Sequence, residues 1–342
     1  MATMAATTNP TATMKAIVRR RWGRPRDVVE LADVPKPEPT DDEVLVRVLA
    51  SSINRSDYYA LGGVAVLMRP FIGGFLRPKS DRFGGDFSGI AEAVGRNVTD
   101  VQPGEEVYGC RTGAFAEYVA ARMAVARKPA NLSFEEAAAV PVAAMTALQA
   151  LRDHGKLETG QRVLVNGGSG GVGTFAVQLA KALGAGHVTA VCSPRNVERV
   201  RELGADRVID YTRENYTRSG ERYDIIVDVA GTHSWRENGR VLVADGIVVL
   251  AGAPSGNRLT GPMGTLAWRW LASRPGKQRL VFFICKPNRP DLAVLRELIE
   301  ARKVHPAVDR VYPFAETADA LETMGEGHVQ GKLVVRIDDD PS

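Results

Sequence analysis

The feature that most constrains the fold of this chain is a run of glycines set between a short apolar stretch and an amphipathic one. The apolar stretch is Val163-Leu164-Val165, the glycines fall between Gly167 and Gly173, and the amphipathic segment begins at Thr174. Strand, glycine turn and helix in this order predict a dinucleotide-binding unit, because glycines permit the turn and let backbone N–H groups touch a pyrophosphate. The loop residues expected to contact the cofactor are Gly168, Ser169, Gly170, Gly171, Val172 and Gly173.

Strands and helices alternate around this loop, which predicts a parallel sheet covered by helices on both faces. The expected strands lie at 187–192, 207–209, 223–229, 247–251 and 280–284, and the expected helices at 135–152, 196–203 and 291–303. The strand at 280–284 is expected to be buried.

The chain before residue 133 has a different pattern of apolar and polar residues. Short stretches of alternating apolar and charged residues at 43–48, 90–94 and 115–119 are separated by Pro, Gly and Asp, which predicts a small antiparallel barrel. Stretches at 310–314 and 332–337 resume that style, so the C-terminus is expected to return to the barrel. The predicted division is a disordered tail at 1–13, a barrel domain made of 14–134 and 304–342, and a dinucleotide-binding domain at 135–303.

Composition excludes several classes of protein. A net charge of +4 over 342 residues argues only weakly for a nucleic-acid partner, and no apolar run approaches the ~20 residues that span a bilayer. Three widely spaced cysteines, Cys110, Cys192 and Cys285, exclude a disulfide framework and fit a reducing compartment. We therefore expect a cytoplasmic protein without nucleic-acid or membrane partners. The basic run at 19–26 is interpreted as a solvated hairpin turn.

The residues that end the second strand of such a unit, about 20 positions beyond the glycines, distinguish NAD from NADP. Here Cys192 is followed by Ser193-Pro194-Arg195, with no acidic residue to accept bonds from a ribose 2′-hydroxyl. Ser193 can donate a hydrogen bond without charge, and Arg195 can bind a phosphate. The prediction is therefore NADPH, with a solvated helix-capping role as the alternative for Arg195. Tyr211, after the third strand, is expected either against the adenosine or in the core.

These residues resemble the medium-chain dehydrogenase/reductase superfamily, in its zinc-independent quinone oxidoreductase branch. The resemblance rests on VLVNGGSGGVGTFAVQLAKALGA, VCSPRN and LGADRVIDY, and extends to INRSDYY, GGDFSGIAEAVG, PGEEVYG and the late GKLVV. It implies an α/β protein with a GroES-like β-barrel catalytic domain beside a Rossmann domain. It also implies an active site in the cleft between the domains, and a homodimer formed through 280–284.

Departures from the zinc alcohol dehydrogenases of that superfamily predict that no metal is bound. Asn54 stands where those enzymes carry a cysteine ligand, and Asp86-Phe87 stands where they carry a His-Glu pair. Zinc sites need several thiolate or imidazole donors that converge on one ion. Of the cysteines, only Cys110 lies near the region of their structural lobe.

Without zinc, other groups must stabilise negative charge on the substrate oxygen. The resemblance carries the family's asparagine onto Asn54 and its pocket tyrosine onto Tyr59, with Tyr58 as the alternate. An amide donates a hydrogen bond without titrating, and a tyrosine is protonated at neutral pH. Asp57 resembles an acidic position of the same segment, and its alternative role is a carboxylate that bonds the turn.

The resemblance assigns further cofactor contacts. Thr146 matches a position that faces the nicotinamide ribose or phosphate, with a hydroxyl bonded back to its own helix as the alternative. Lys332 matches the family's Gly-Lys pair, with a surface lysine as the alternative. The remaining expected contacts are Ala251, Gly252 and Ala253 around the carboxamide, and Phe282 and Phe283 against the ring.

The sequence thus predicts an NADPH-dependent, zinc-independent reductase of an apolar quinone or α,β-unsaturated carbonyl compound. Hydride would pass to the acceptor in a water-poor cleft, with Asn54 and Tyr59 polarising the substrate oxygen. The alternatives are a zinc-free carbonyl reductase or alcohol dehydrogenase, and a non-catalytic nucleotide-binding protein.

Overall fold

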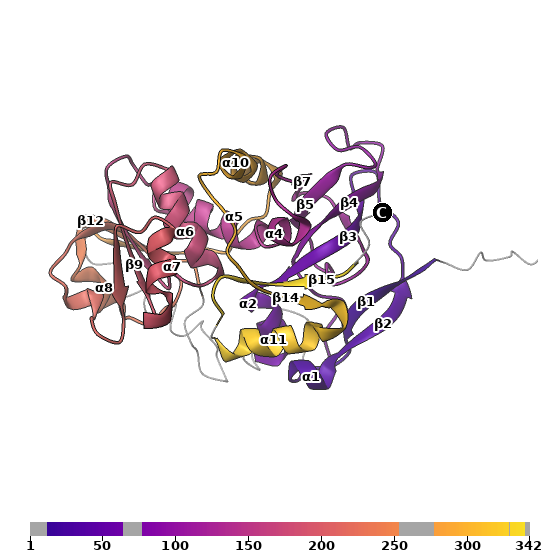
Figure 1. Cartoon of the computed structure of the whole chain (residues 1–342), viewed down its shortest axis with the longest axis horizontal. Coiled ribbons are helices and arrows are strands. Elements are labelled where there is room, and N and C mark those ends of the chain that lie inside the picture. Colours follow the sequence, from indigo (N-terminus) through magenta and orange to yellow (C-terminus); the bar gives the residue numbers. More distant parts are fainter. Residues whose placement is uncertain (1–11, 64–76, 253–276, 328, 339–342) are drawn as a thin grey trace, which may run out of the picture.

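The computed structural model describes residues 12–63, 77–252, 277–327 and 329–338. Within them the chain forms a six-stranded sheet, a seven-stranded sheet and a two-stranded ribbon. Figure 1 shows the two large sheets at opposite ends of the molecule, with α5 (Pro141–Gln149) between them. This α/β architecture has the parallel sheet and the separate β domain that the sequence predicts.

The six-stranded sheet is parallel and has the order β10-β9-β8-β11-β12-β13. Its central strands are nearly continuous apolar runs because helices cover both of their faces. The strands are β8 (Arg162–Asn166), β9 (His187–Cys192), β10 (Arg207–Asp210), β11 (Tyr223–Asp228), β12 (Leu242–Leu250) and β13 (Arg279–Phe282). The other helical segments of this half are η3 (Ala150–His154), α6 (Gly171–Ala182), η4 (Pro194–Asn196), α7 (Val197–Glu202), η5 (Tyr216–Arg218), α8 (Trp235–Gly239) and α10 (Arg289–Glu300).

The seven-stranded sheet has the order β14-β15-β3-β4-β5-β7, with β6 paired to β3. Its strands are β3 (Val44–Ile53), β4 (Asp86–Val94), β5 (Glu106–Cys110), β6 (Tyr118–Ala121), β7 (Val125–Arg127), β14 (Val308–Pro313) and β15 (Lys332–Arg336). The chain therefore returns to this sheet after the parallel one, as its late strand patterns predict. The remaining elements are the ribbon β1 (Thr13–Arg19) and β2 (Val29–Pro35), with α1 (Pro25–Val28), α2 (Arg55–Tyr58), η1 (Tyr59–Gly63), α4 (Phe134–Ala138), η6 (Phe314–Glu316) and α11 (Thr317–Glu326).

Three local expectations are wrong. The last two strands, β14 and β15, pair in parallel rather than antiparallel, because the unpredicted helix α11 supplies the crossover that parallel pairing requires. Strand β13 is not buried: it lies at the sheet edge, and Phe282 is 44% exposed. In the basic run, Arg19 is 7% exposed rather than solvated, since its guanidinium lies over the rings of Trp22 and Phe83. The run's other arginines are exposed, as expected: Arg20, Arg21, Arg24 and Arg26.

The two halves share a core. One hydrophobic cluster joins Tyr108 of β5 to α5, α6 and the parallel strands. The Tyr108 hydroxyl donates a 2.6 Å hydrogen bond to the Leu292 carbonyl of α10. Where one domain ends and the next begins, at 134/135 and 303/304, stays a prediction.

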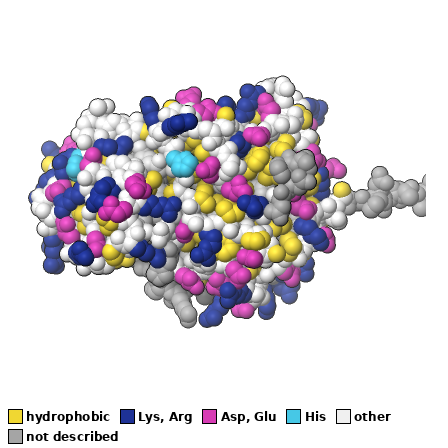
Figure 2. Space-filling view, in the orientation of Figure 1, with side chains coloured by type: hydrophobic (Ala, Val, Ile, Leu, Met, Phe, Trp, Pro, Cys, Tyr) yellow, Lys and Arg dark blue, Asp and Glu magenta, His cyan; other side chains and the backbone are white. Residues whose placement is uncertain are grey.

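The surface is of mixed charge on the face shown in Figure 2, where Lys and Arg alternate with Asp and Glu and apolar side chains lie between them. Such mixing gives this face no extended field of one sign. In the described part of the chain, no helix combines the length and apolar character needed to cross a membrane.

Candidate functional site between the two sheets

The glycine loop connects β8 to α6 at the carboxyl edge of the parallel sheet. Gly167 has φ +93, a conformation that favours glycine, and Gly170 caps α6. A Cβ on Gly173 would lie 2.0 Å from the Gly167 carbonyl oxygen, so only glycine lets the helix approach the loop this closely. Gly168 packs against Ala190. The first turn of α6 therefore presents its backbone N–H groups at the loop.

Two cavities adjoin this loop and form one groove. The inner cavity, about 300 Å³, lies between the loop and the β domain, and the outer cavity, about 600 Å³, lies beyond the carboxyl ends of β8 and β9. Both are lined by Gly167, Ser169, Ala230, Gly327 and Val329. The inner cavity is also lined by Gly170, Gly171, Val172, Asn54, Arg55 and Lys332.

The outer cavity contains the residues expected to choose the cofactor. Ser193, Arg195 and Tyr211 line it together, and its described lining includes no carboxylate. Tyr211 is 61% exposed, so the alternative of a core tyrosine is wrong. Asn196 donates through Nδ2 to the Ser193 hydroxyl at 2.9 Å. Its Oδ1 is buried with no hydrogen-bond partner among the described residues, which fits a cavity that receives a polar ligand.

The inner cavity is bordered by a buried polar network on the β domain. Lys332 is 2% exposed, so the alternative of a surface lysine is wrong. Its ammonium donates to Asn54 Oδ1 at 2.7 Å and to Asp86 Oδ2 at 3.3 Å. Asn54 Nδ2 donates to the same Asp86 oxygen at 2.8 Å. An amide donor and a buried cation therefore lie beside the glycine loop.

Asp57 bonds the turn, which is the structural role considered for it. Its Oδ2 accepts the Asn54 backbone N–H at 2.8 Å. Burial raises the pKa of Asp57 to about 7, with the Asp86 carboxylate adding to the rise and the hydrogen bond from Asn54 opposing it. The side chain therefore holds Asn54 in place at the start of α2.

The two tyrosines of this segment have different neighbours. Tyr58 packs on α11, since a Cβ on Gly325 would lie 2.4 Å from its ring. The Tyr59 ring lies 5.9 Å from the guanidinium of Arg55, which itself lines the inner cavity. Neither tyrosine is among the residues that line that cavity, so the catalytic role of Tyr59 stays a prediction.

Other predicted contacts lie outside the groove. The Thr146 hydroxyl donates to the Val142 carbonyl at 2.6 Å, which is the own-helix alternative. Phe283 stacks on His154 with ring centroids 4.3 Å apart, and neither it nor Phe282 lines either cavity.

The expected carboxamide segment begins directly after β12. Ala251 donates its N–H to the Asp228 carbonyl at 3.1 Å, and a Cβ on Gly252 would lie 2.1 Å from the Val229 oxygen. Ala253 lies outside the described residues.

Sequence reasoning gave no role to Asp86, although this fully buried carboxylate is the centre of the network. Its oxygens accept from Ser52, Asn54, Lys332 and the Val142 N–H. The available signal was a carboxylate at the start of a strand whose next residues, Phe87 to Ala91, carry no charge. Within the ranges that the structure describes, no group of three or more His, Cys, Asp or Glu side chains could hold a metal ion.

Comparisons with known proteins agree with this architecture. Residues 40–131 match the family described as alcohol dehydrogenase GroES-like domain, and residues 203–335 the family described as zinc-binding dehydrogenase. The mitochondrial NAD(P)H oxidoreductase RTN4IP1 of Mus musculus is 34% identical, over 86% of this chain and 82% of the relative. The 2-methylene-furan-3-one reductase of Solanum lycopersicum is 33% identical, over 90% and 76%. The solved structure of the quinone oxidoreductase from Coxiella burnetii has a TM-score of 0.82 and 30% identity, over 96% and 100%.

Proposed function

This chain belongs to the medium-chain dehydrogenase/reductase superfamily of oxidoreductases, and from that premise we propose that it is an NADPH-dependent, zinc-independent reductase of quinones or α,β-unsaturated carbonyl compounds. The observation that carries the proposal is the inner cavity, where the glycine loop and the Asn54 amide line the same space. The names of a quinone oxidoreductase and of a 2-methylene-furan-3-one reductase among the similar proteins support this substrate class.

The groove fits a phosphorylated nicotinamide cofactor, which would supply the hydride when bound. Gly170, Gly171 and the first turn of α6 would hold the pyrophosphate through backbone N–H groups and the helix dipole. Ser193 and Arg195 would bind the 2′-phosphate, and Arg195 does so through its charge. Tyr211 would pack on the adenosine.

The substrate oxygen would lie against Asn54, whose amide needs no metal to stabilise negative charge. Nδ2 carries two hydrogens, and one of them is used by Asp86, which leaves a donor for the substrate. Tyr59 or water would supply the proton that the reduced product needs.

The test compares initial rates with NADPH and NADH against a quinone, an enone and a saturated ketone. We expect turnover of the quinone or the enone and at least a ~10-fold preference for NADPH in kcat/KM, from the charge-assisted phosphate contact. Arg195→Ala should remove most of that preference. Arg201→Ala, on the exposed surface of α7 with Glu198 as its partner, is the matched control. Turnover of the ketone alone, a preference for NADH, or stoichiometric zinc would overturn the proposal.

We also propose a cytoplasmic homodimer. Strand β13 has a free edge within the described part of the parallel sheet, and Ile284 beyond it is 77% exposed. A second copy could extend the sheet there. Light scattering of wild type and Ile284→Asp is the measurement, and a wild-type mass of one subunit would contradict the dimer.

A further inference from the structure

The network at Asn54 fixes the orientation of its amide. Oδ1 accepts from the Lys332 ammonium, and Nδ2 donates to the Asp86 carboxylate. The flipped amide would place Nδ2 hydrogens against the ammonium and Oδ1 against the carboxylate, so both neighbours reject it. Asp86 is itself held by Ser52 and by the Val142 N–H.

Lys332 is also tied to the glycine loop on the other side of the groove. The preceding residue, Gly331, donates its N–H to the Ser169 carbonyl at 2.9 Å. A Cβ on Gly171 would lie 2.9 Å from Lys332 Cδ, so the lysine stem packs on the start of α6. The same side chain thus contacts the loop that would hold the cofactor and the amide that would hold the substrate.

We propose that Lys332 is a positioning residue, rather than a cofactor ligand: it fixes the Asn54 amide and makes that orientation depend on the glycine loop. This inference rests on the proposed function. The Lys332 ammonium bonds both Asn54 and Asp86, and the residue is only 2% exposed, so in this arrangement its main contact is with the amide rather than with a ligand. Its contribution to turnover therefore passes through Asn54.

A double-mutant cycle tests this dependence. Lys332→Met keeps an apolar side chain of similar length and removes the charge. We expect kcat to fall ~10- to 100-fold, as for loss of one oriented donor. The Kd for NADPH should change less than ~3-fold. Because the lysine acts through the amide, Lys332→Met should cost less than ~3-fold further in an Asn54→Ala background. Multiplied losses in the double variant, or an NADPH Kd raised ~10-fold with kcat unchanged, would overturn the proposal.

Lys332→Met leaves the Asp86 carboxylate buried without its cation, so it can lower the folded fraction. The variant Lys332→Met with Asp86→Asn removes both charges of the Lys332–Asp86 pair and should show the same loss in kcat. Lys128→Met is the matched control, because Lys128 is also buried but bonds Leu132 and Glu106 away from the groove. It should keep the wild-type kcat, and a fall equal to that of Lys332→Met would count against a specific role.

Two readouts separate this inference from the proposed function. If wild type turns over no quinone or enone with NADPH, the proposed function fails. If wild type is active and the cycle is additive, only the positioning role fails.

Discussion

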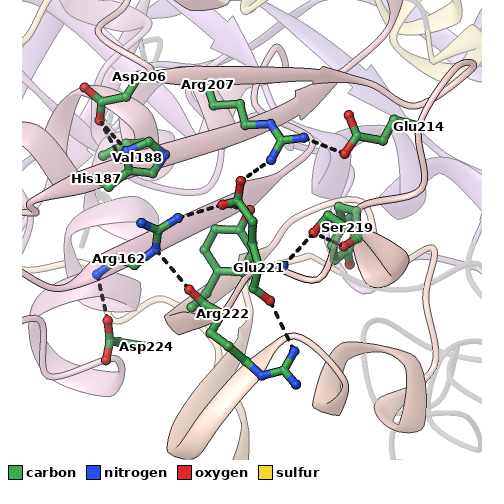
Figure 3. Close-up of polar contacts among 12 residues, drawn as sticks. Arg162, His187, Val188, Asp206, Arg207, Glu214, Ser219, Glu221, Arg222 and Asp224 are labelled. Atoms are coloured by element: carbon green, nitrogen blue, oxygen red, sulfur yellow. Dashed lines mark hydrogen bonds and ion pairs between the residues drawn. The ribbon is translucent and has the colours of Figure 1, made fainter.

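The two ends of the parallel sheet are both polar, but they are polar in different ways. At the amino ends of β8, β9, β10 and β11 the charged side chains bond one another, as Figure 3 shows for Arg162, Glu221 and Arg207. At the carboxyl ends the chain offers glycines, a helix N-terminus and the groove. One end is closed by internal charge pairing, and the other is left open to a ligand.

The amino-end cluster is a chain of ion pairs. Arg162 donates to Glu221 at 2.6 Å, Glu221 also contacts Arg207, and Arg207 donates to Glu214 at 2.6 Å. Burial alone would raise the pKa of Glu221, but the guanidinium groups of Arg207 and Arg162 outweigh it and hold the pKa below its usual value. This end therefore gains stability from its carboxylates.

Across the groove, on α2 of the β domain, a carboxyl group shows the opposite pKa shift. Asp57, next to Asn54, has a pKa raised to about 7, chiefly by burial. A carboxyl group in that state is less stable as an anion than it would be in water. When Asp57 is ionised it therefore lowers the stability of the fold. Such groups are common where side chains are arranged for function rather than stability.

A side chain added at Gly173 should change stability and cofactor binding the most. Gly173→Ala would place a Cβ 2.0 Å from the Gly167 oxygen. Because that oxygen belongs to the backbone, the loop or the helix would have to shift to make room. We expect the free energy of unfolding to fall by ~3 kcal/mol or more, with loss of NADPH binding. Urea unfolding and fluorescence titration measure both. Wild-type behaviour in both would show that the close packing here is not required.

Gly170→Ala, in the same loop, should weaken cofactor binding without a large change in stability. Its Cβ would meet no atom nearer than 3.8 Å, so stability should stay within ~1 kcal/mol of wild type. The new methyl lies at the inner cavity, and we expect the Kd for NADPH to rise ~10- to 100-fold, or 1.4 to 2.8 kcal/mol by the usual conversion. Unchanged affinity would place the pyrophosphate elsewhere.

Asp57→Asn should change the pH dependence of stability. Because the folded-state pKa of about 7 lies above that of a free carboxyl, folding takes up a proton, and stability falls as pH rises from about 4 to 7. The variant should lack this loss and gain roughly 3 kcal/mol on wild type between pH 4.5 and 8. Unfolding at both pH values gives the difference. A constant difference between the two proteins would refute the raised pKa.

Glu221→Gln should have the smallest effect and the opposite sign. The lowered pKa of Glu221 means that its stabilisation is present above the free carboxyl's pKa and is lost as pH falls through the folded-state pKa. We expect a loss of ~1 kcal/mol at pH 7, since the pairs are partly exposed, that shrinks in acid. The Kd for NADPH should not change. A weakened affinity for NADPH would contradict the view that the amino-end ion pairs contribute to stability alone.

The glycine loop and the strand that precedes it were predictable because their cause is local. Gly167 has a left-handed backbone conformation and Gly173 has no room for a Cβ, so both positions of the turn require glycine. The edge position of β13 was not predictable, because an apolar run reads the same at the edge of a sheet as at its centre. Helix α11 was missed, although it determines that β14 and β15 run in parallel.

The site divides in the same way. Ser193, Arg195 and Tyr211 follow strand ends of a parallel sheet, so their meeting in one cavity follows from the sequence order. Residues 54, 86 and 332 come from three strands or their ends in the other sheet, and no spacing rule brings them together. Thr146 is an example of a local interaction in place of a predicted long-range one, since its hydroxyl donates to a carbonyl one helical turn away.

The parallel sheet, the glycine loop and the side chains that follow β9 could be predicted because each depends on residues close together in the chain. The burial of Lys332 against Asn54 and Asp86 could not, because a return of the chain after more than 240 residues places these three side chains together. Long-range pairing, rather than local propensity, thus places the charged side chains beside the inner cavity.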